Sequence, residues 1–157
     1  MQIRILSTRN EELTSEETSR NINYEEMSPI RTNAGSDVIA MQSAGGSASA
    51  TATAHWMAIT ANATTPSATD TTLTGELTTT GLIRAAATFA HTAGTSVYTL
   101  TRTFTTSGTD VVPVTLAKIG IFDAITSGNL CFETLLSATA TLTVLGDAVT
   151  VTHTITF

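Results

Sequence analysis

The sequence predicts an all-β protein, an antiparallel β-sandwich of jelly-roll or immunoglobulin-like type with an extended N-terminal arm. Three observations lead to this prediction. Threonine makes up 35 of the 157 residues, and its branched side chain suits a pleated, half-solvated strand. About six or seven short segments alternate apolar and polar residues, with turn formers about every 8–12 positions. Charged residues crowd into the first 31 positions, which sets an arm apart from the rest.

The first clear strand is the segment HWMAIT at 55–60. It has large side chains at both parities, which predicts a central or interface position in a sheet. Residues 62–75, NATTPSATDTTLTG, are rich in turn formers and predict a loop. Two more strands are expected over 83–92 and 97–106. Arg102 interrupts the apolar face of the second, so we expect it near the strand end, snorkelling or paired with a carboxylate.

Val111–Leu136 reads VVPVTLAKIGIFDAITSGNLCFETLL. Two apolar, β-branched runs flank the turn-forming stretch Asp123–Asn129, which predicts two strands and a tight connection. The parity of the apolar residues changes within the first run. We therefore expect a bulge at Gly120 or at the Ala117-Lys118 step.

The C-terminal segment gives the cleanest pattern. A strand is expected over Ala138–Leu145, followed by a turn at Gly146-Asp147. From Val149 to Phe157 the apolar positions alternate strictly with threonine. This period of two predicts that the C-terminus belongs to a sheet.

Residues 1–31 form the predicted arm, and residues 32–157 the predicted sandwich domain. The arm carries ten of the chain's 20 charged residues (7 Lys and Arg plus 13 Asp and Glu). Its apolar residues are too spread out to bury a face alone, so we expect it to become ordered on a neighbouring molecule; a disordered tail is the alternative. The residues expected to contact a partner are Ile3, Ile5, Leu13, Tyr24, Met27 and, more weakly, Trp56.

The residues that could carry chemistry form no known motif, and we expect no enzyme, no catalytic residue, no cofactor and no metal site. His55, His91 and His153 lie on different predicted strands; His153 falls in an apolar file, which favours a satisfied core or interface histidine. Cys131 is expected to be a small buried hydrophobe. The carboxylates at turns are expected to accept backbone hydrogen bonds. These turn carboxylates are Asp70, Glu76, Asp110, Asp123 and Asp147. The alternative role for these carboxylates is a catalytic pair for glycoside hydrolysis. It is disfavoured because few aromatic residues are present to hold a sugar.

Charge and hydropathy exclude further classes. The net charge is −6 and Lys118 is the only lysine, so no basic groove for nucleic acid is expected. The N-terminal residues are charged and lack the apolar core of a secretory signal. No apolar run approaches the roughly 18 residues needed to span a bilayer. We therefore expect a soluble protein, made in a cytoplasm, that contacts neither nucleic acid nor membrane.

Four stretches together resemble a family of small structural proteins of tailed bacteriophages. They are HWMAITANATTPSATDTTLTGEL, IRAAATFAHTAGTSVYTLTRTFT, AKIGIFDAITSGNLCFETLL and GDAVTVTHTITF, and they cover roughly residues 32–157. Their common signatures are a T-x-P-x-x-x-D-T-x-L-x-x-E loop, a G-[IL]-F-[DN]-A…G-x-L hairpin and a terminal G-D-x-[LV]-x-V-T strand. The chain departs from the family at 59–62, where Ile-Thr-Ala-Asn replaces a glycine-rich stretch.

The resemblance implies a virion structural protein, assembled in the host cytoplasm and located in the virion. It implies partners among other virion proteins, such as major capsid or tail subunits, and a homo-oligomer. A capsid decoration, or cement, protein is the expected function, with the arm lending contact area to a neighbour. The alternative is a tail, baseplate or head-fibre module that recognises a host-surface glycan. A bacterial adhesin domain is a third alternative, weakened by the absence of a signal sequence.

Overall fold

The structure is a computed structural model that describes residues 4–8, 30–35, 53–95 and 97–156. These residues form an all-β fold with two antiparallel sheets, as the sequence predicts. The strands are β1 (Arg4–Thr8), β2 (Ile30–Arg31), β3 (Trp56–Thr60), β4 (Ala85–Ala86), β5 (Thr88–His91), β6 (Val97–Thr105), β7 (Val114–Phe122), β8 (Leu130–Leu142) and β9 (Ala148–Thr156).

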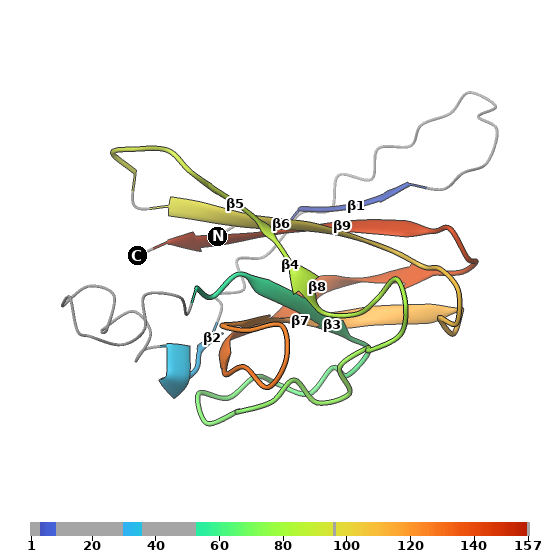
Figure 1. Cartoon of the computed structure of the whole chain (residues 1–157), viewed down its shortest axis with the longest axis horizontal. Helices are drawn as coiled ribbons and strands as arrows, with labels where there is room; N and C mark the ends of the chain where they lie inside the picture. The colour runs from blue at the N-terminus through green and yellow to red at the C-terminus, as the bar shows by residue number, and fades with distance from the viewer. Residues whose placement is uncertain (1–3, 9–29, 36–52, 96, 157) are drawn as a thin grey trace.

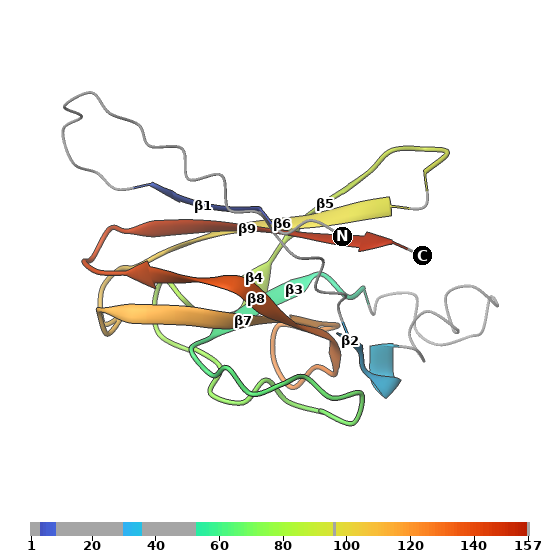
Figure 2. The ribbon, with the colours of Figure 1, turned by 180° about the vertical axis from the view of Figure 1, so that it is seen from behind.

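The strands form two layers, seen from opposite sides in Figures 1 and 2. The four-stranded sheet, here sheet A, has the order β1-β9-β6-β5. The five-stranded sheet, here sheet B, has the order β2-β8-β7-β3-β4. Successive strands enter the sheets in pairs: β3 and β4 lie in sheet B, β5 and β6 in sheet A, and β7 and β8 in sheet B again.

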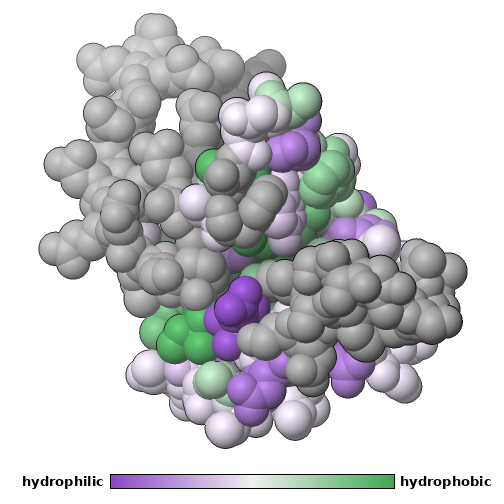
Figure 3. Space-filling model, turned by 90° about the vertical axis from the view of Figure 1, so that its left-hand side faces the viewer, coloured by the Kyte–Doolittle hydropathy of each residue, from purple (hydrophilic) through white to green (hydrophobic). Residues whose placement is uncertain are grey.

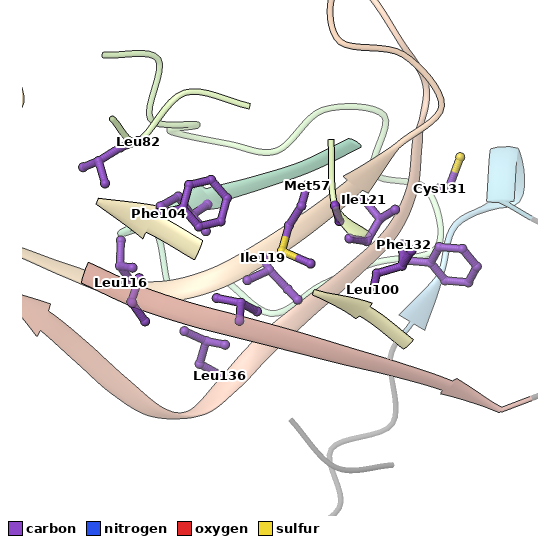
Figure 4. Close-up of a cluster of buried hydrophobic side chains, with 14 of the residues drawn as sticks. Met57, Leu82, Leu100, Phe104, Leu116, Ile119, Ile121, Cys131, Phe132 and Leu136 are labelled. Carbon is purple, nitrogen blue, oxygen red and sulfur yellow. The ribbon is translucent and has the colours of Figure 1, made fainter. Parts of the chain in front are cut away.

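One hydrophobic core lies between the two sheets (Figure 4). Sheet A contributes Leu100 and Phe104 from β6 and alternate residues of β9, all buried. Sheet B contributes Met57 and Ile59 from β3 and apolar residues of β7 and β8. The period-2 patterns of β6 and β9 explain this arrangement, because one parity faces the core and the other carries threonine.

The predicted hairpin is confirmed as β7 and β8, joined by residues 123–129. Asp123 closes the connection, since its carboxylate accepts hydrogen bonds from the Asn129 backbone N–H (2.7 Å) and side-chain Nδ2 (2.8 Å). The register shifts between Leu116 and Lys118, which confirms the bulge at the Ala117-Lys118 step. Gly120, the other candidate, pairs in register with Glu133.

Two strand predictions are wrong in extent. The segment 83–92 is not one strand but two, and β4 and β5 belong to different sheets. Ala87 lies buried between them, where the chain passes from sheet B to sheet A. Leu130–Leu142 is a single strand rather than two, because its far end continues the pairing with β7 as far as Val114↔Leu142.

The two described pieces of the predicted arm belong to the sheets. β1 pairs with β9, from Arg4↔Thr152 to Thr8↔Ala148. β2 pairs with β8 through Ile30↔Glu133 and Arg31↔Phe132. The rest of the arm lies outside the described residues, so only its attachment points to the two sheets are defined.

The predicted loop at 62–75 covers the outer face of sheet B. Leu73 packs there on Ala58, Phe122 and Leu130, with Trp56 at the edge of this second cluster. This confirms that β3 is covered on both faces, as its large residues at both parities predicted.

Gly120 allows the close packing of the second cluster. A Cβ atom on this glycine would lie 2.9 Å from Leu130 Cδ1 and 3.2 Å from Leu73 Cδ2. The absence of a side chain therefore lets the loop lie directly on the strand.

Candidate functional site

The most unusual polar group of the described residues is a buried ion pair on the outer face of sheet B. Lys118 on β7 and Glu133 on β8 lie 2.5 Å apart (Nζ to Oε1), and each side chain is 1% exposed. The bulge at Ala117 turns the Lys118 side chain to the outer face of sheet B. Glu133 lies on the same face because it pairs with Gly120. Two charges this deeply buried are costly unless every polar atom has a partner.

The loop of residues 61–84 supplies the other groups around this pair. The carbonyl oxygen and Oγ1 of Thr64 each lie 3.2 Å from Lys118 Nζ and accept hydrogen bonds from it. Asp70 is close enough to Glu133 for each to affect the pKa of the other, and its Oδ2 accepts a hydrogen bond from the Ser67 N–H at 2.8 Å. Lys118, Glu133, Asp70 and Thr64 are named here the lysine cluster.

The acid groups of the lysine cluster differ in their affinity for protons. Burial raises the pKa of Glu133, and the neighbouring Asp70 raises it further against the opposing effect of Lys118. The Ser67 backbone hydrogen bond, followed by the Glu133 contact, lowers the pKa of Asp70. Two carboxyls can share a hydrogen bond only if one is protonated, and these directions make Glu133 the weaker acid of the two.

One oxygen of Glu133 lacks a conventional partner. Glu133 Oε2 is buried and accepts no hydrogen bond from the described residues. A proton held between Oε2 and Asp70 would satisfy it. The lysine cluster is therefore a set of coupled groups rather than a simple ion pair.

A second ion pair holds the end of the same loop. The guanidinium of Arg84 binds Glu76 in bidentate fashion (Nε–Oε1 2.9 Å, Nη2–Oε2 2.5 Å). Its Nη1 donates to the Ala124 carbonyl, and its Cζ lies 3.4 Å from the centre of the Phe122 ring. This arrangement combines a fork-like hydrogen-bonded pair with a cation–π contact, and fixes the 61–84 loop on sheet B.

The open edge of sheet A is the most exposed described element. All four residues of β5 are exposed, and Phe89 is 60% exposed. The Phe89 ring lies 5.5 Å from the Tyr98 ring and 6.5 Å from the His91 ring, measured between centroids. On the face shown in Figure 3, the coloured apolar areas are separated by polar ones. Other exposed apolar residues of the described chain include Val111, Val144 and Leu145.

The histidines form no common site within the described residues. His55 hydrogen-bonds to Thr53, and His91 Nδ1 to the Val97 carbonyl at 2.8 Å. His153 is fully buried in the core, as expected, but neither ring nitrogen has a hydrogen-bond partner. The expectation of a satisfied histidine is therefore wrong, and burial lowers the pKa of His153 to about 4.

Most predictions for the cysteine and the turn carboxylates are confirmed. Cys131 is buried, and burial, followed by the charge of Asp123, raises the pKa of its thiol to about 12. Four of the turn carboxylates accept hydrogen bonds from backbone N–H groups. These are Asp70, Asp110, Asp123 and Asp147. Glu76 differs, because it binds Arg84.

Arg102 does not lie where the sequence predicted. It stands inside β6, opposite Val151, and forms no ion pair with a described carboxylate. Its Nε is buried without a hydrogen-bond partner. The guanidinium carbon lies 5.9 Å from the centre of the Phe104 ring, so the core aromatic is its nearest defined contact.

The predicted contact residues are placed in part. Ile5 belongs to β1 and pairs with Val151 of β9. Trp56 is half-buried, packs on the second cluster and lies 5.0 Å from the His55 ring. The other four lie outside the described residues. These are Ile3, Leu13, Tyr24 and Met27.

Comparisons with known proteins identify no relative: no family model, no curated protein and no solved structure matches the chain. Within the described residues, no set of three His, Cys, Asp or Glu side chains could hold a metal ion. No helix in this part of the chain has the length and apolar character to cross a membrane.

The lysine cluster is the group that sequence reasoning missed. The change of parity near Ala117 was visible, and it places the only lysine on the same face as Gly120. The sequence does not show that the 61–84 loop folds over this face. A lone lysine in an apolar strand, followed by a lone glutamate in the next apolar strand, is the signal that could have revealed the pair.

Proposed function

We propose that this protein is a non-enzymatic structural protein of a tailed-bacteriophage virion and, within that class, a capsid decoration protein. The observation that carries the proposal is the open β5 edge of sheet A. Its four residues, Thr-Phe-Ala-His, are all exposed, and none is lysine or proline. Lysine and proline commonly protect sheet edges from pairing with other chains. Because this edge has neither, it suits contact with another subunit.

The other edge of sheet A supports the same proposal. β1 and β5 are the two edge strands of this sheet, and β5 is the one whose side chains are all exposed among those described. An edge strand with an exposed aromatic residue can bind an extended segment of a neighbour by adding a strand. Aromatic residues are also enriched at the centres of protein interfaces.

The arm adds a second contact in this proposal. The sequence between β1 and β2 contains Leu13, Tyr24 and Met27 among many charges. Because β1 and β2 anchor its two ends to different sheets, the segment is tethered at both ends. We propose that these three residues contact a neighbouring capsid subunit or a second copy, and that the protein is a homo-oligomer.

For the finer fold type, we favour the immunoglobulin-like sandwich over the jelly roll. The reason is that successive strands enter the two sheets in pairs. The strand order is not that of an immunoglobulin domain, so the proposed likeness concerns the general pattern of connections.

Binding to particles of the encoding virus that lack the protein tests the function. We expect the full chain to bind such particles, Phe89→Asp to bind at least tenfold more weakly, and the double variant Tyr24→Ser, Met27→Ser to be weakened similarly. Both variants retain β1. A deletion of residues 1–27 would remove β1 together with the arm, so point substitutions are the cleaner test. Thr72→Asp, at an exposed position of the loop over sheet B, is the matched control. Unchanged binding of Phe89→Asp would contradict the role of the edge, and no binding by the full chain would contradict the decoration function.

The glycan-binding alternative draws on the same aromatic residues. Phe89 and Tyr98 offer neighbouring rings, a kind of surface on which sugars can stack. A glycan array and a pull-down with host cells distinguish the two functions. Binding of the isolated protein to a polysaccharide, lost in Phe89→Ala, together with no binding to particles would favour the alternative.

A further inference from the structure

We propose that the side chains of Lys118 and Glu133 join by an amide (isopeptide) bond that forms spontaneously in the folded protein, with Asp70 relaying the proton. This inference does not rest on the proposed function. It rests on the geometry of the lysine cluster, which holds an amine and a carboxyl in contact out of water, with the half-buried Asp70 carboxyl nearby. The bond would link β7 to β8 covalently.

The first support is the contact between the reacting groups. Lys118 Nζ lies 2.5 Å from Glu133 Oε1, and both side chains are almost fully buried. Thr64 accepts hydrogen bonds from the same nitrogen through two oxygens, which hold the amine against the carboxyl. Holding two groups in contact gives effective concentrations of about 10⁵ M or more in favourable intramolecular reactions.

The second support is the protonation state that burial favours. A buried ammonium and a buried carboxylate both lose their hydration, and transfer of one proton from the amine to the carboxyl removes both charges. The neutral amine is the nucleophilic form of lysine. The protonated carboxyl is the better electrophile of its two forms, and the raised pKa of Glu133 agrees with it.

The third support is the position of Asp70. Within the part of the chain that the structure describes, Glu133 Oε2 accepts no hydrogen bond, and Asp70 is the acid group that affects the pKa of Glu133. An Asp70 carboxylate beside a protonated Glu133 can take a proton from one atom and return it to another.

The reaction balances without an added reagent. The Lys118 nitrogen attacks the Glu133 carboxyl carbon and forms the C–N bond. Asp70 accepts a proton from the nitrogen and delivers it to the Glu133 hydroxyl oxygen. The C–O bond then breaks, and one water molecule leaves. Two buried charges are replaced by a neutral amide, and the release of water adds to the driving force.

Mass spectrometry of the purified full chain tests the proposal. We expect an intact mass lower than that of the sequence by one water molecule. Trypsin should fail to cleave after Lys118, because an acylated lysine is not a substrate. The fragment 103–157 should then remain whole, whereas an unlinked chain yields 103–118 and 119–157. Fragmentation should locate the link at Lys118 and Glu133.

Three variants sharpen the test. Lys118→Arg keeps the positive charge but cannot form the bond, so it should show the full mass and cleavage after residue 118. Asp70→Asn keeps the amine and Glu133 but removes the relay, so most molecules should stay unlinked. Thr69→Ala changes an exposed neighbour of Asp70 and should stay linked.

The wild-type chain alone can overturn the proposal, whether or not a variant folds. A folded chain, judged by a β-type circular dichroism spectrum and a cooperative melt, that shows the full mass would mean an ordinary ion pair. A link from Lys118 to Asp70 would refute Glu133 as the electrophile. Loss of water located at another residue would refute the bond altogether.

Discussion

Sheet A has one face against the core and one face of threonine hydroxyls, whereas sheet B is covered on both faces where the 61–84 loop lies over β3 and the Lys118–Phe122 part of β7. On β6 and β9 the outward residues are threonines, and the pair Thr103–Thr150 is hydrogen-bonded across the strands at 2.7 Å. On β7 nearly every residue is buried, because the 61–84 loop covers the outer face. An antiparallel sheet can leave one face to water, so the covering of sheet B is the feature that needs explanation.

The comparison separates two roles for polar groups. The hydrogen bonds between threonines of sheet A contribute little to stability, because at a solvated surface water replaces a lost hydrogen bond. Lys118 and Glu133 in the lysine cluster of sheet B are shielded from water, so each depends on the other and on its remaining partners. The open edge and wet face of sheet A suit contacts with other molecules, while sheet B is already occupied by its own chain.

The largest expected effect is on the core that the two sheets share. Phe104→Ala should lower the free energy of unfolding by about 3–5 kcal/mol, because it leaves a cavity in a fully buried site. Phe89→Ala, the same change on the exposed edge, should cost about 0.5 kcal/mol or less. Urea denaturation of both variants measures the difference. Equal losses would mean that β5 is not an open edge.

The buried His153 makes the stability of the core depend on pH. Its pKa of about 4 lies below the ordinary value of 6.5, so the unfolded chain binds the proton more readily. Stability is therefore complete above about pH 6.5 and declines as the pH falls to about 4, by up to about 3 kcal/mol.

The matched variant His153→Leu isolates this effect. Asp70 and Glu133 also titrate in acid, so the quantity to measure is the difference between wild type and variant in urea melts from pH 7 to pH 4. That difference should change over this range. A constant difference would show that His153 is not protonated on unfolding.

The loop that covers sheet B gives the next test. Leu73→Ala should cost about 2–3 kcal/mol, because Leu73 is buried against Ala58, Phe122 and Leu130. Its exposed neighbour Thr72 serves as the control, and Thr72→Ala should stay within about 0.5 kcal/mol. If thermal melts show no difference between the two, the loop does not contribute to the stability of sheet B.

The smallest effect is expected on the outer face of sheet A. Thr150→Ala removes the hydrogen bond to Thr103 at an accessible site, so it should cost only about 0.5 kcal/mol. Chemical denaturation of Thr150→Ala and of Phe104→Ala would compare the free energies of unfolding lost on the two faces of sheet A. A loss above about 2 kcal/mol would mean that this face is covered.

Local alternation predicted the parts of the fold in which one face is wet. The strands β6 and β9 and the Asp123–Asn129 connection follow directly from residue patterns. Patterns also revealed the bulge at Ala117-Lys118, because the bulge shifts the parity. They could not show that the chain changes sheets at Ala87, since a small residue fits a continuous strand equally well.

The lysine cluster was beyond reach for a different reason. Asp70 and Thr64 are far from Lys118 in sequence, and only the fold of the 61–84 loop brings them together. Arg102 is a second example. Strand alternation predicted which face of β6 carries it, but not which residues surround its side chain. Side-chain partners contributed by loops depend on tertiary structure rather than on local pattern.

The central claim is that sheet A is the side of the molecule that meets other subunits. Because we propose a virion protein, a cryo-electron microscopy map of purified phage particles tests it most directly. The account predicts many copies of the protein on the particle, with the β5 edge and Phe89 at the contact and the 61–84 loop turned away. Absence of the protein from the particle, or a contact made through the 61–84 loop, would contradict it.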